Sequence, residues 1–87
     1  MKEVRFAKGF KKDFEKLSPK LKKRFWERIE LWQEQPVHPL LNHHVLRGEF
    51  AGLHSINITG DLRAIYDEIN GEIVIYVMIG THSQLYG

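Results

Sequence analysis

The fold is decided by residues 53–79, LHSINITGDLRAIYDEINGEIVIYVMI. This stretch contains three runs rich in β-branched and aromatic residues, and short polar turns separate them. The second turn is Asn70-Gly71, a strong hairpin signal whose two residues must both tolerate positive φ. The stretch therefore predicts a meander of three antiparallel strands, over Leu53–Thr59, Leu62–Glu68 and Ile73–Ile79.

The residues before the meander predict one more strand and two helices. Polar and apolar side chains alternate over Lys2–Lys8, which is the period of a half-buried strand. Apolar residues then recur twice at helical spacing. Ser18-Pro19 separates the two helices as an N-cap followed by proline, and Pro36 ends the second helix. The apolar positions are Phe10, Phe14 and Leu17 in the first helix, and Leu21, Phe25, Ile29 and Trp32 in the second.

Together these patterns predict an α+β fold. We expect an N-terminal strand, a two-helix hairpin and a three-stranded antiparallel meander, with the helices on one face of the sheet and the other face open. The segment Val37–Glu49 shows no sustained period and is expected to be an irregular surface connection. The tail Gly80–Gly87 follows the last strand directly. A chain of 87 residues can bury only one core, so we expect a single domain over 1–87.

The composition excludes several classes of protein. With 43% hydrophobic and 28% charged residues, the chain is typical of a folded domain. It has no cysteine, which excludes a disulfide framework and a thiolate zinc site. His43 and His44 would point to opposite sides of an extended chain, and no His-x-x-x-His spacing occurs, so we predict no metal and no cofactor. The longest apolar run, Ile73–Ile79, is too short to span a bilayer, and we expect a cytoplasmic protein without a membrane partner.

Charge is distributed unevenly along the chain. Residues 1–28 contain eleven Lys and Arg against four Asp and Glu, whereas residues 29–87 contain two against seven. The basic part could attract a polyanion, with Lys20 and Lys23 as candidate substrate contacts, or its lysines could simply be the solvated faces of helices. Arg47 and Arg63 are the only Lys or Arg residues after Arg28.

Four strings of residues stand out: His44-Val45-Leu46-Arg47-Gly48, Gly52-Leu53-His54-Ser55-Ile56, Asp61-Leu62-Arg63-Ala64-Ile65-Tyr66 and Gly80-Thr81-His82-Ser83-Gln84-Leu85-Tyr86-Gly87. They resemble strings of the RelE/ParE toxin superfamily, and most closely its YafQ branch. The resemblance covers nearly the entire chain, and its most specific part is the tail, in which Gly-x-His is followed by a spaced leucine and an aromatic residue. It implies a toxin of a type II toxin–antitoxin system, and many such toxins cut mRNA on the ribosome without a metal.

Metal-free cleavage of RNA uses the ribose 2′-OH as nucleophile, so the protein must supply an acid, a base and a cation. His82 corresponds to the histidine of the family's tail motif and is expected to protonate the 5′-oxygen leaving group. The alternative for His82 is a capping or surface histidine with no catalytic role. Arg63 lies in a mostly apolar strand, an unfavourable position for a charge unless an anion meets it, and is expected to bind the phosphate. The alternative for Arg63 is an ion pair with Asp61, Asp67 or Glu68.

The other candidate catalytic residues depend on the resemblance. Tyr86 corresponds to the family's terminal aromatic residue, which stacks on a base or orients the phosphate, although packing against the sheet edge is the alternative. Asp61 aligns with an acidic residue of the YafQ site and could orient an imidazole, act as a base, or only form the turn. His44 as a catalytic group and Arg47 as a substrate contact could reach the RNA from the surface segment.

The chain departs from the YafQ pattern at three positions. Asn57, a candidate substrate contact, stands where the pattern has histidine, Leu62 where it has tryptophan and Met78 where it has arginine. The acid/base set is therefore incomplete, and His44 or His54 could compensate. Two other functions stay open: a ParE-like, non-catalytic inhibitor of DNA gyrase, and a degenerate toxin that only binds its antitoxin.

A cognate antitoxin protein is the partner expected for a toxin of this kind. An exposed sheet face and grooves between helices would offer apolar sites to a segment that folds on binding. The nuclease would in addition meet mRNA and the ribosome. Operator DNA would be bound only through the antitoxin.

Overall fold

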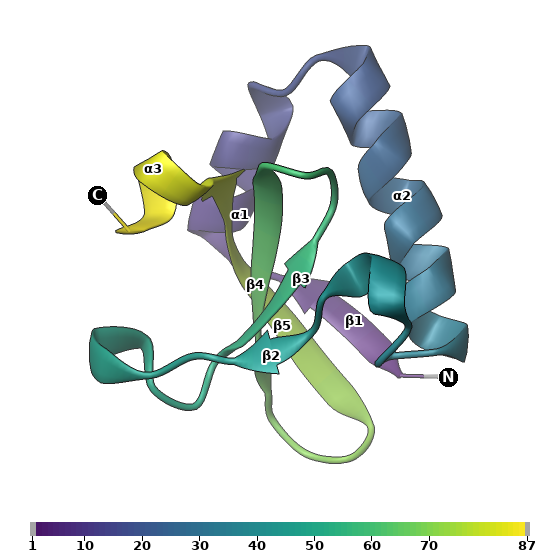
Figure 1. Cartoon of the computed structure of the whole chain (residues 1–87), viewed down its shortest axis with the longest axis vertical. Helices are drawn as coiled ribbons and strands as arrows, with labels where there is room; N and C mark the ends of the chain where they lie inside the picture. The colour runs from purple at the N-terminus through teal and green to yellow at the C-terminus, as the bar shows by residue number, and fades with distance from the viewer. Residues whose placement is uncertain (1, 87) are drawn as a thin grey trace.

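The structure is a computed structural model and describes residues 2–86 (Figure 1). Met1 and Gly87, the ends of the domain predicted over 1–87, lie outside the described residues. The elements in chain order are β1 (Glu3–Phe6), α1 (Lys8–Glu15), α2 (Pro19–Glu34), the 3-10 turn η1 (Pro39–Leu41), β2 (His44–Val45), the 3-10 turn η2 (Gly48–Phe50), β3 (His54–Asn57), β4 (Leu62–Glu68), β5 (Ile73–Thr81) and α3 (His82–Tyr86).

The sheet has five strands in the order β1-β5-β4-β3-β2. β3, β4 and β5 form the predicted antiparallel meander, and β1 pairs with β5 in parallel. β2 adds a short antiparallel strand beside β3. The helices α1 and α2 lie against one face of this sheet (Figure 1), which confirms the predicted α+β arrangement.

The two-helix hairpin forms where the sequence predicted it. The Ser18 hydroxyl accepts a hydrogen bond from the backbone N–H of Leu21 at 3.2 Å, and Pro19 is the first helical residue. This cap satisfies one of the N–H groups that have no partner inside the helix. α2 ends at Glu34, just before Pro36.

The core lies between this hairpin and the sheet. Phe25 and Trp32 of α2 and Tyr76 of β5 are fully buried there. The Phe25 and Tyr76 rings lie 5.9 Å apart, and the Trp32 and Tyr76 rings 5.7 Å apart, within the range of favourable edge-to-face contacts. No helix of the described residues is both long enough and apolar enough to cross a membrane.

The opposite sheet face is less open than predicted. Ile65 and Ser55, which face each other across β4 and β3, are fully buried although the large core cluster does not include them. Their strand neighbours Ala64 and Ile56 belong to that core cluster, so alternation places Ile65 and Ser55 on the other face. The segment from β2 to η2 and the helix α3 lie on that side (Figure 1).

The turn between β4 and β5 differs from the predicted one. The hairpin forms, but neither Asn70 nor Gly71 has positive φ. The loop between the two strands instead spans residues 69–72, and the Asn70 side-chain oxygen accepts hydrogen bonds from the N–H groups of Glu72 at 2.8 Å and Ile73 at 3.0 Å. Asparagine therefore stabilises this turn through its side chain rather than through a left-handed backbone.

Candidate active site

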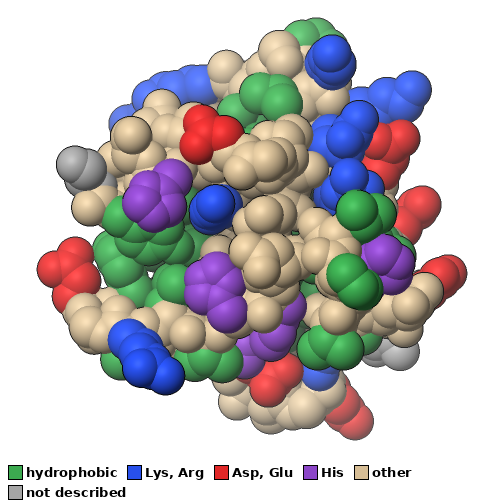
Figure 2. All heavy atoms as spheres, viewed as in Figure 1, with side chains coloured by type: hydrophobic (Ala, Val, Ile, Leu, Met, Phe, Trp, Pro, Cys, Tyr) green, Lys and Arg blue, Asp and Glu red, His purple; other side chains and the backbone are tan. Residues whose placement is uncertain are grey.

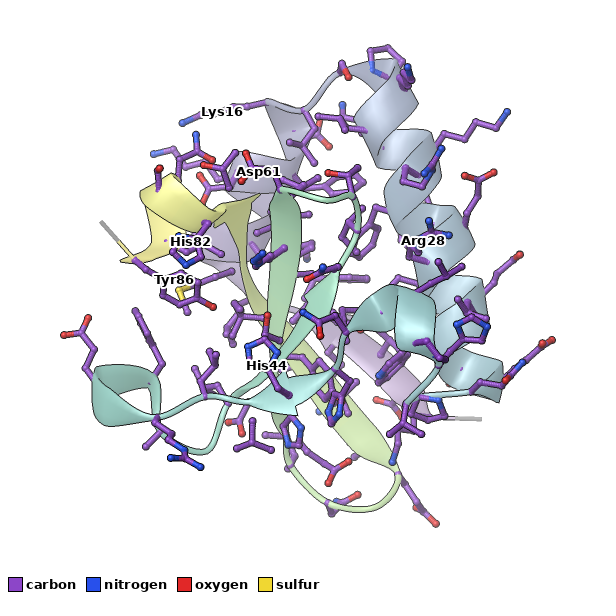
Figure 3. All side chains as sticks on the ribbon, viewed as in Figure 1. Lys16, Arg28, His44, Asp61, His82 and Tyr86 are labelled. Carbon is purple, nitrogen blue, oxygen red and sulfur yellow. The ribbon has the colours of Figure 1, made fainter. Side chains whose placement is uncertain are left out.

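A pocket of about 390 Å³ opens on the sheet face that α1 and α2 leave free. Histidine side chains and one basic side chain border this hollow in Figure 2. Figure 3 shows His82 and Tyr86 on α3, across from His44 on β2. The structure thus brings His44, Arg63, His82 and Tyr86 together from three elements that are separate in the sequence. The lining residues are Asn42, His44, Leu46, Arg63, His82 and Tyr86.

Arg63 comes from β4, the middle strand of the sheet. It faces Asn57 of β3 on one side and Gly80 of β5 on the other. Its Nε atom is buried and has no hydrogen-bond partner among the described residues. The alternative of an ion pair is wrong within residues 2–86, because no Asp or Glu carboxylate lies within 4.0 Å of Arg63. The guanidinium group is therefore available to an anion in the pocket.

His82 and Tyr86 are placed by a helix that begins directly after β5. The N–H of Thr81 donates to the Gln84 side-chain oxygen at 2.8 Å, and the N–H of Gln84 donates to the Thr81 hydroxyl at 3.2 Å. This reciprocal pair is a capping box, which fixes the start of α3. The exposed His82 ring packs against Tyr86, with ring centroids 4.8 Å apart.

Gly80 allows this helix to fold back against β5. A Cβ atom at Gly80 would lie 3.0 Å from the Gln84 side-chain oxygen and 3.4 Å from Leu85. A larger residue at this position would therefore crowd the Gln84 and Leu85 side chains of α3, which would have to move aside by a few tenths of an ångström. On the same helix, the Tyr86 hydroxyl is buried without a hydrogen-bond partner among the described residues.

His44 reaches the pocket from the short strand β2. Its Nδ1 atom lies 3.0 Å from the backbone carbonyl oxygen of Asn42. A carbonyl oxygen can only accept, so Nδ1 carries the proton and the neutral ring keeps its lone pair on Nε2. Asn42 has left-handed backbone angles, φ 45° and ψ 46°, which turn the chain at the end of η1. The structure thus holds His44 in the tautomer that can take up a proton at Nε2.

His43 and His54 form a separate pair on the other side of β2 and β3. His43 Nε2 lies 2.9 Å from His54 Nδ1, and the His54 ring stacks on Tyr66 with centroids 4.8 Å apart. Burial lowers the pKa of His43, and the neighbouring His54 and His44 lower it further. His54 does not line the pocket, because side chains alternate along β3 and Ser55 and Asn57 lie on the pocket side.

The other predicted substrate contacts and Asp61 lie outside the pocket lining. Asp61 is exposed in the β3–β4 turn, near the start of α3 in Figure 3. Arg47 borders a neighbouring hollow. The Asn57 side-chain oxygen is buried beside Arg63 without a partner among residues 2–86. Lys20 and Lys23 are exposed on α2, whose packing on the other sheet face keeps them out of the pocket.

Two residues that line the pocket, Asn42 and Leu46, were not among the site residues predicted from the sequence. Helix α3 was not predicted either, although Thr81-His82-Ser83-Gln84 carries the capping-box signal. Nothing in the sequence singled out Asn42, because its role depends on a backbone conformation that asparagine only sometimes adopts.

The described residues do not form a cluster of potential metal ligands. Within residues 2–86, no three His, Asp or Glu side chains are close enough together to hold a metal ion. The pocket's titratable groups are imidazoles and a phenol, which suits proton transfer better than the binding of a hard cation.

Known proteins share this architecture. The structure of YafQ from E. coli strain BL21(DE3) has a TM-score of 0.82 at 16% identity, with both chains fully covered. A YoeB/ParE toxin from Agrobacterium tumefaciens has a TM-score of 0.76 at 21% identity and covers 94% of this chain and 99% of its own. The toxin in the E. coli DinJ-YafQ complex has a TM-score of 0.74 at 18% identity, with full coverage of both chains.

Sequence comparison gives the family directly. No curated protein is significantly similar to the chain in sequence. The profile described as "Bacterial toxin of type II toxin-antitoxin system, YafQ" matches residues 2–87. The chain therefore belongs to the YafQ family of toxins from type II toxin–antitoxin systems.

Proposed function

We propose that this toxin is a metal-independent endoribonuclease that cleaves mRNA at the ribosome. The observation that carries the proposal is the pocket lined by His44, His82 and Arg63, whose buried Nε has no partner among the described residues. Two imidazoles and a free guanidinium are the groups that cleavage of a phosphodiester by its own 2′-OH requires.

We assign the roles by the chemistry that each side chain can supply. His44 Nε2 takes the proton from the 2′-OH, whose oxygen then forms a bond to phosphorus. The bond from phosphorus to the 5′-oxygen breaks, and His82 protonates that oxygen as it leaves. Arg63 stabilises the negative charge that builds on the phosphate oxygens. The products are a 2′,3′-cyclic phosphate and a free 5′-hydroxyl.

The remaining candidates act around this centre. Tyr86 lies against His82 and orients the phosphate or stacks on a base. Asn57 pairs with Arg63 across β3 and β4, and its side chain contacts the substrate. Asp61 lies near the start of α3 and orients His82 once RNA is bound. Arg47, Lys20 and Lys23 contact the RNA backbone outside the pocket.

The test compares the purified toxin with His82→Ala on mRNA bound to translating ribosomes. Loss of a general acid typically lowers the rate by about 10²–10⁴-fold. The matched control is Ser83→Ala, which changes the next exposed residue of α3 and leaves the pocket lining intact. A deoxynucleotide at the cleavage position should abolish the reaction, because no 2′-OH is left to attack.

Two results would reject the nuclease. One is cleavage by His82→Ala at the rate of the Ser83→Ala control, with the fold of both variants verified by circular dichroism. The other is an intact mRNA together with stoichiometric inhibition of DNA gyrase in a supercoiling assay, which would assign the ParE-like function instead.

We also propose a cognate antitoxin as the partner, by analogy with the E. coli YafQ that has been solved with DinJ. An apolar groove of about 240 Å³ between α1, α2 and β1 supports this proposal. It is lined by Phe6, Phe10 and Phe14, and Trp26 beside them is 49% exposed. The surrounding chain is basic, so an acidic antitoxin segment fits it. The antitoxin would carry the operator DNA contact of the complex. Recovery of the toxin alone from cells that express both the toxin gene and its neighbouring antitoxin gene would count against this partner.

A further inference from the structure

A second hollow adjoins the pocket on the side away from His44. It measures about 480 Å³ and is lined by Arg47, Glu49, Phe50, Leu85 and Tyr86. Tyr86 also lines the first pocket, so the two hollows meet at this residue of α3. Figure 2 shows apolar side chains exposed between α3 and the loop that contains η2.

Aromatic rings connect the two hollows. The Tyr86 ring lies 4.8 Å from His82 on one side and 6.0 Å from Phe50 on the other, measured between centroids. The Phe50 and Tyr86 rings are inclined at 69° and both are half-buried, so part of each ring stays accessible. An accessible ring beside a phosphate site offers a surface on which a base can stack.

The loop holds Phe50 in a defined position. Gly48 and Gly52 have φ angles of 71° and 90°, which other residues rarely adopt, and they shape the turn on either side of Phe50. The backbone N–H of Leu46 donates to the carbonyl of Leu53 at 2.8 Å and closes the base of the loop. These features restrict the backbone on both sides of Phe50 and keep this residue beside Tyr86.

The charged side chains around the second hollow favour a nucleobase over a second phosphate as its ligand. Arg47 and Arg63 are the two cations of residues 29–87, and each lines one of the two adjoining hollows. Within residues 2–86, neither of them forms an ion pair. Glu49 also lines the second hollow, and its carboxylate would repel a phosphate placed there but can accept hydrogen bonds from a base.

We infer that this second hollow is a binding site for the nucleobase next to the cleaved phosphodiester. The inference rests on the proposed nuclease function. The base stacks on Phe50 and the edge of Tyr86, while Arg47 contacts the following phosphate. Phe50 thereby fixes the register of the RNA over His44 and His82.

The first experiment measures kcat/KM for Phe50→Ala on mRNA with either an intact or an abasic nucleotide beside the cleavage position. On intact mRNA, loss of the stacking ring should lower kcat/KM roughly 5- to 150-fold. On the mRNA that lacks the stacked base, the wild type and Phe50→Ala should be equal. Phe50→Tyr keeps a ring and should restore the wild-type rate, and Ile69→Ala is the control for loss of an exposed apolar side chain elsewhere.

A second measurement separates this inference from the nuclease function. Fluorescent aminopurine at the same position should be quenched when the mRNA binds the non-cleaving His82→Ala protein, and Phe50→Ala in that background should remove the quenching. If the wild type does not cleave, only the nuclease proposal is rejected. The quenching still tests whether the second hollow binds a base. Quenching that is independent of Phe50 would overturn the subsite. So would a Phe50→Ala variant that quenches normally but no longer binds the antitoxin, since the hollow would then be a protein contact.

Discussion

Acidification is expected to destabilise the pairing of β2 with β3, because His43 and His54 form a pair of imidazoles beside it. Their facing nitrogens lie 2.9 Å apart, and such a contact requires one nitrogen to donate and the other to accept. When the His43 ring takes up a second proton, its positive charge must be held in a partly buried position, which burial and the neighbouring His54 and His44 oppose. β2 is vulnerable because its pairing with β3 involves only His44 and Val45.

The sign of the effect follows from the pKa of His43. Burial lowers this pKa below its ordinary value of 6.5, the charges of His54 and His44 lower it further, and Glu68 opposes them. The unfolded chain therefore takes up the proton at a higher pH than the folded protein does. The free energy of unfolding should be constant well above pH 6.5 and should fall as the pH decreases through 6.5 toward the folded-state pKa.

The size of the effect has an upper limit. One proton bound by the unfolded chain alone changes the free energy of unfolding by at most about 1.4 kcal/mol per pH unit. His43 is half-exposed, so solvent screening keeps the loss below this limit. Over one pH unit below the ordinary histidine pKa, we expect the toxin to lose about 1 kcal/mol or less.

The assay is urea unfolding of the wild type and of His43→Phe at about pH 7.5 and about pH 5.5, on either side of the ordinary histidine pKa. Phenylalanine keeps a ring against His54 but cannot titrate, so the variant should lose less stability on acidification. Hydrogen exchange should show β2 amides opening first in the wild type. An equal loss of stability in both proteins would refute the assignment to His43.

Three further changes test how the site is held. Thr81→Ala should remove the capping box, lower the local stability of α3 by about 1 kcal/mol and reduce cleavage through misplacement of His82, whereas Thr81→Ser should not; equal hydrogen exchange of α3 in the two variants would contradict this. Asn42→Val should strain the left-handed backbone by about 1–3 kcal/mol and disturb the His44 tautomer, while Asn42→Gly should preserve the tautomer, as nitrogen NMR of the imidazole can show. Identical spectra for the two Asn42 variants would count against the tautomer argument. Burial raises the pKa of Tyr76, whose hydroxyl has no partner among residues 2–86, so Tyr76→Phe should leave the urea midpoint unchanged or raise it; a lower midpoint would reveal a hidden hydrogen bond.

The larger elements were predictable because each carries a repeated signal. The apolar residues of α2 recur at helical spacing, and Ser18-Pro19 marks its start, so both features appear in the structure. β2 has two residues and α3 has five, which is too short for any period to emerge. The parallel pairing of β1 with β5 joins residues about seventy positions apart, and no local pattern specifies it.

The site was predictable only in part, for a related reason. His44, Arg63, His82 and Tyr86 were chosen by type and by resemblance, and the structure places all four around one pocket. Their approach depends on α3 and β2, which the sequence analysis did not predict. Asn70-Gly71 was assigned the wrong turn because the alternative, a side-chain hydrogen bond, uses the same asparagine.

The division between the two sheet faces explains how this small chain can hold a reactive site. The aromatic core against α1 and α2 supplies most of the buried apolar surface, and the strand carrying Arg63 is anchored in it. The pocket face adds β2, η2 and α3, which are held by the short pairing of β2 with β3 and by a few cap and turn hydrogen bonds. Elements with so few contacts open at a lower free energy than the core does. Substitutions at the caps should therefore lower the cleavage rate with little change in the free energy of global unfolding. Substitutions in the core should lower both.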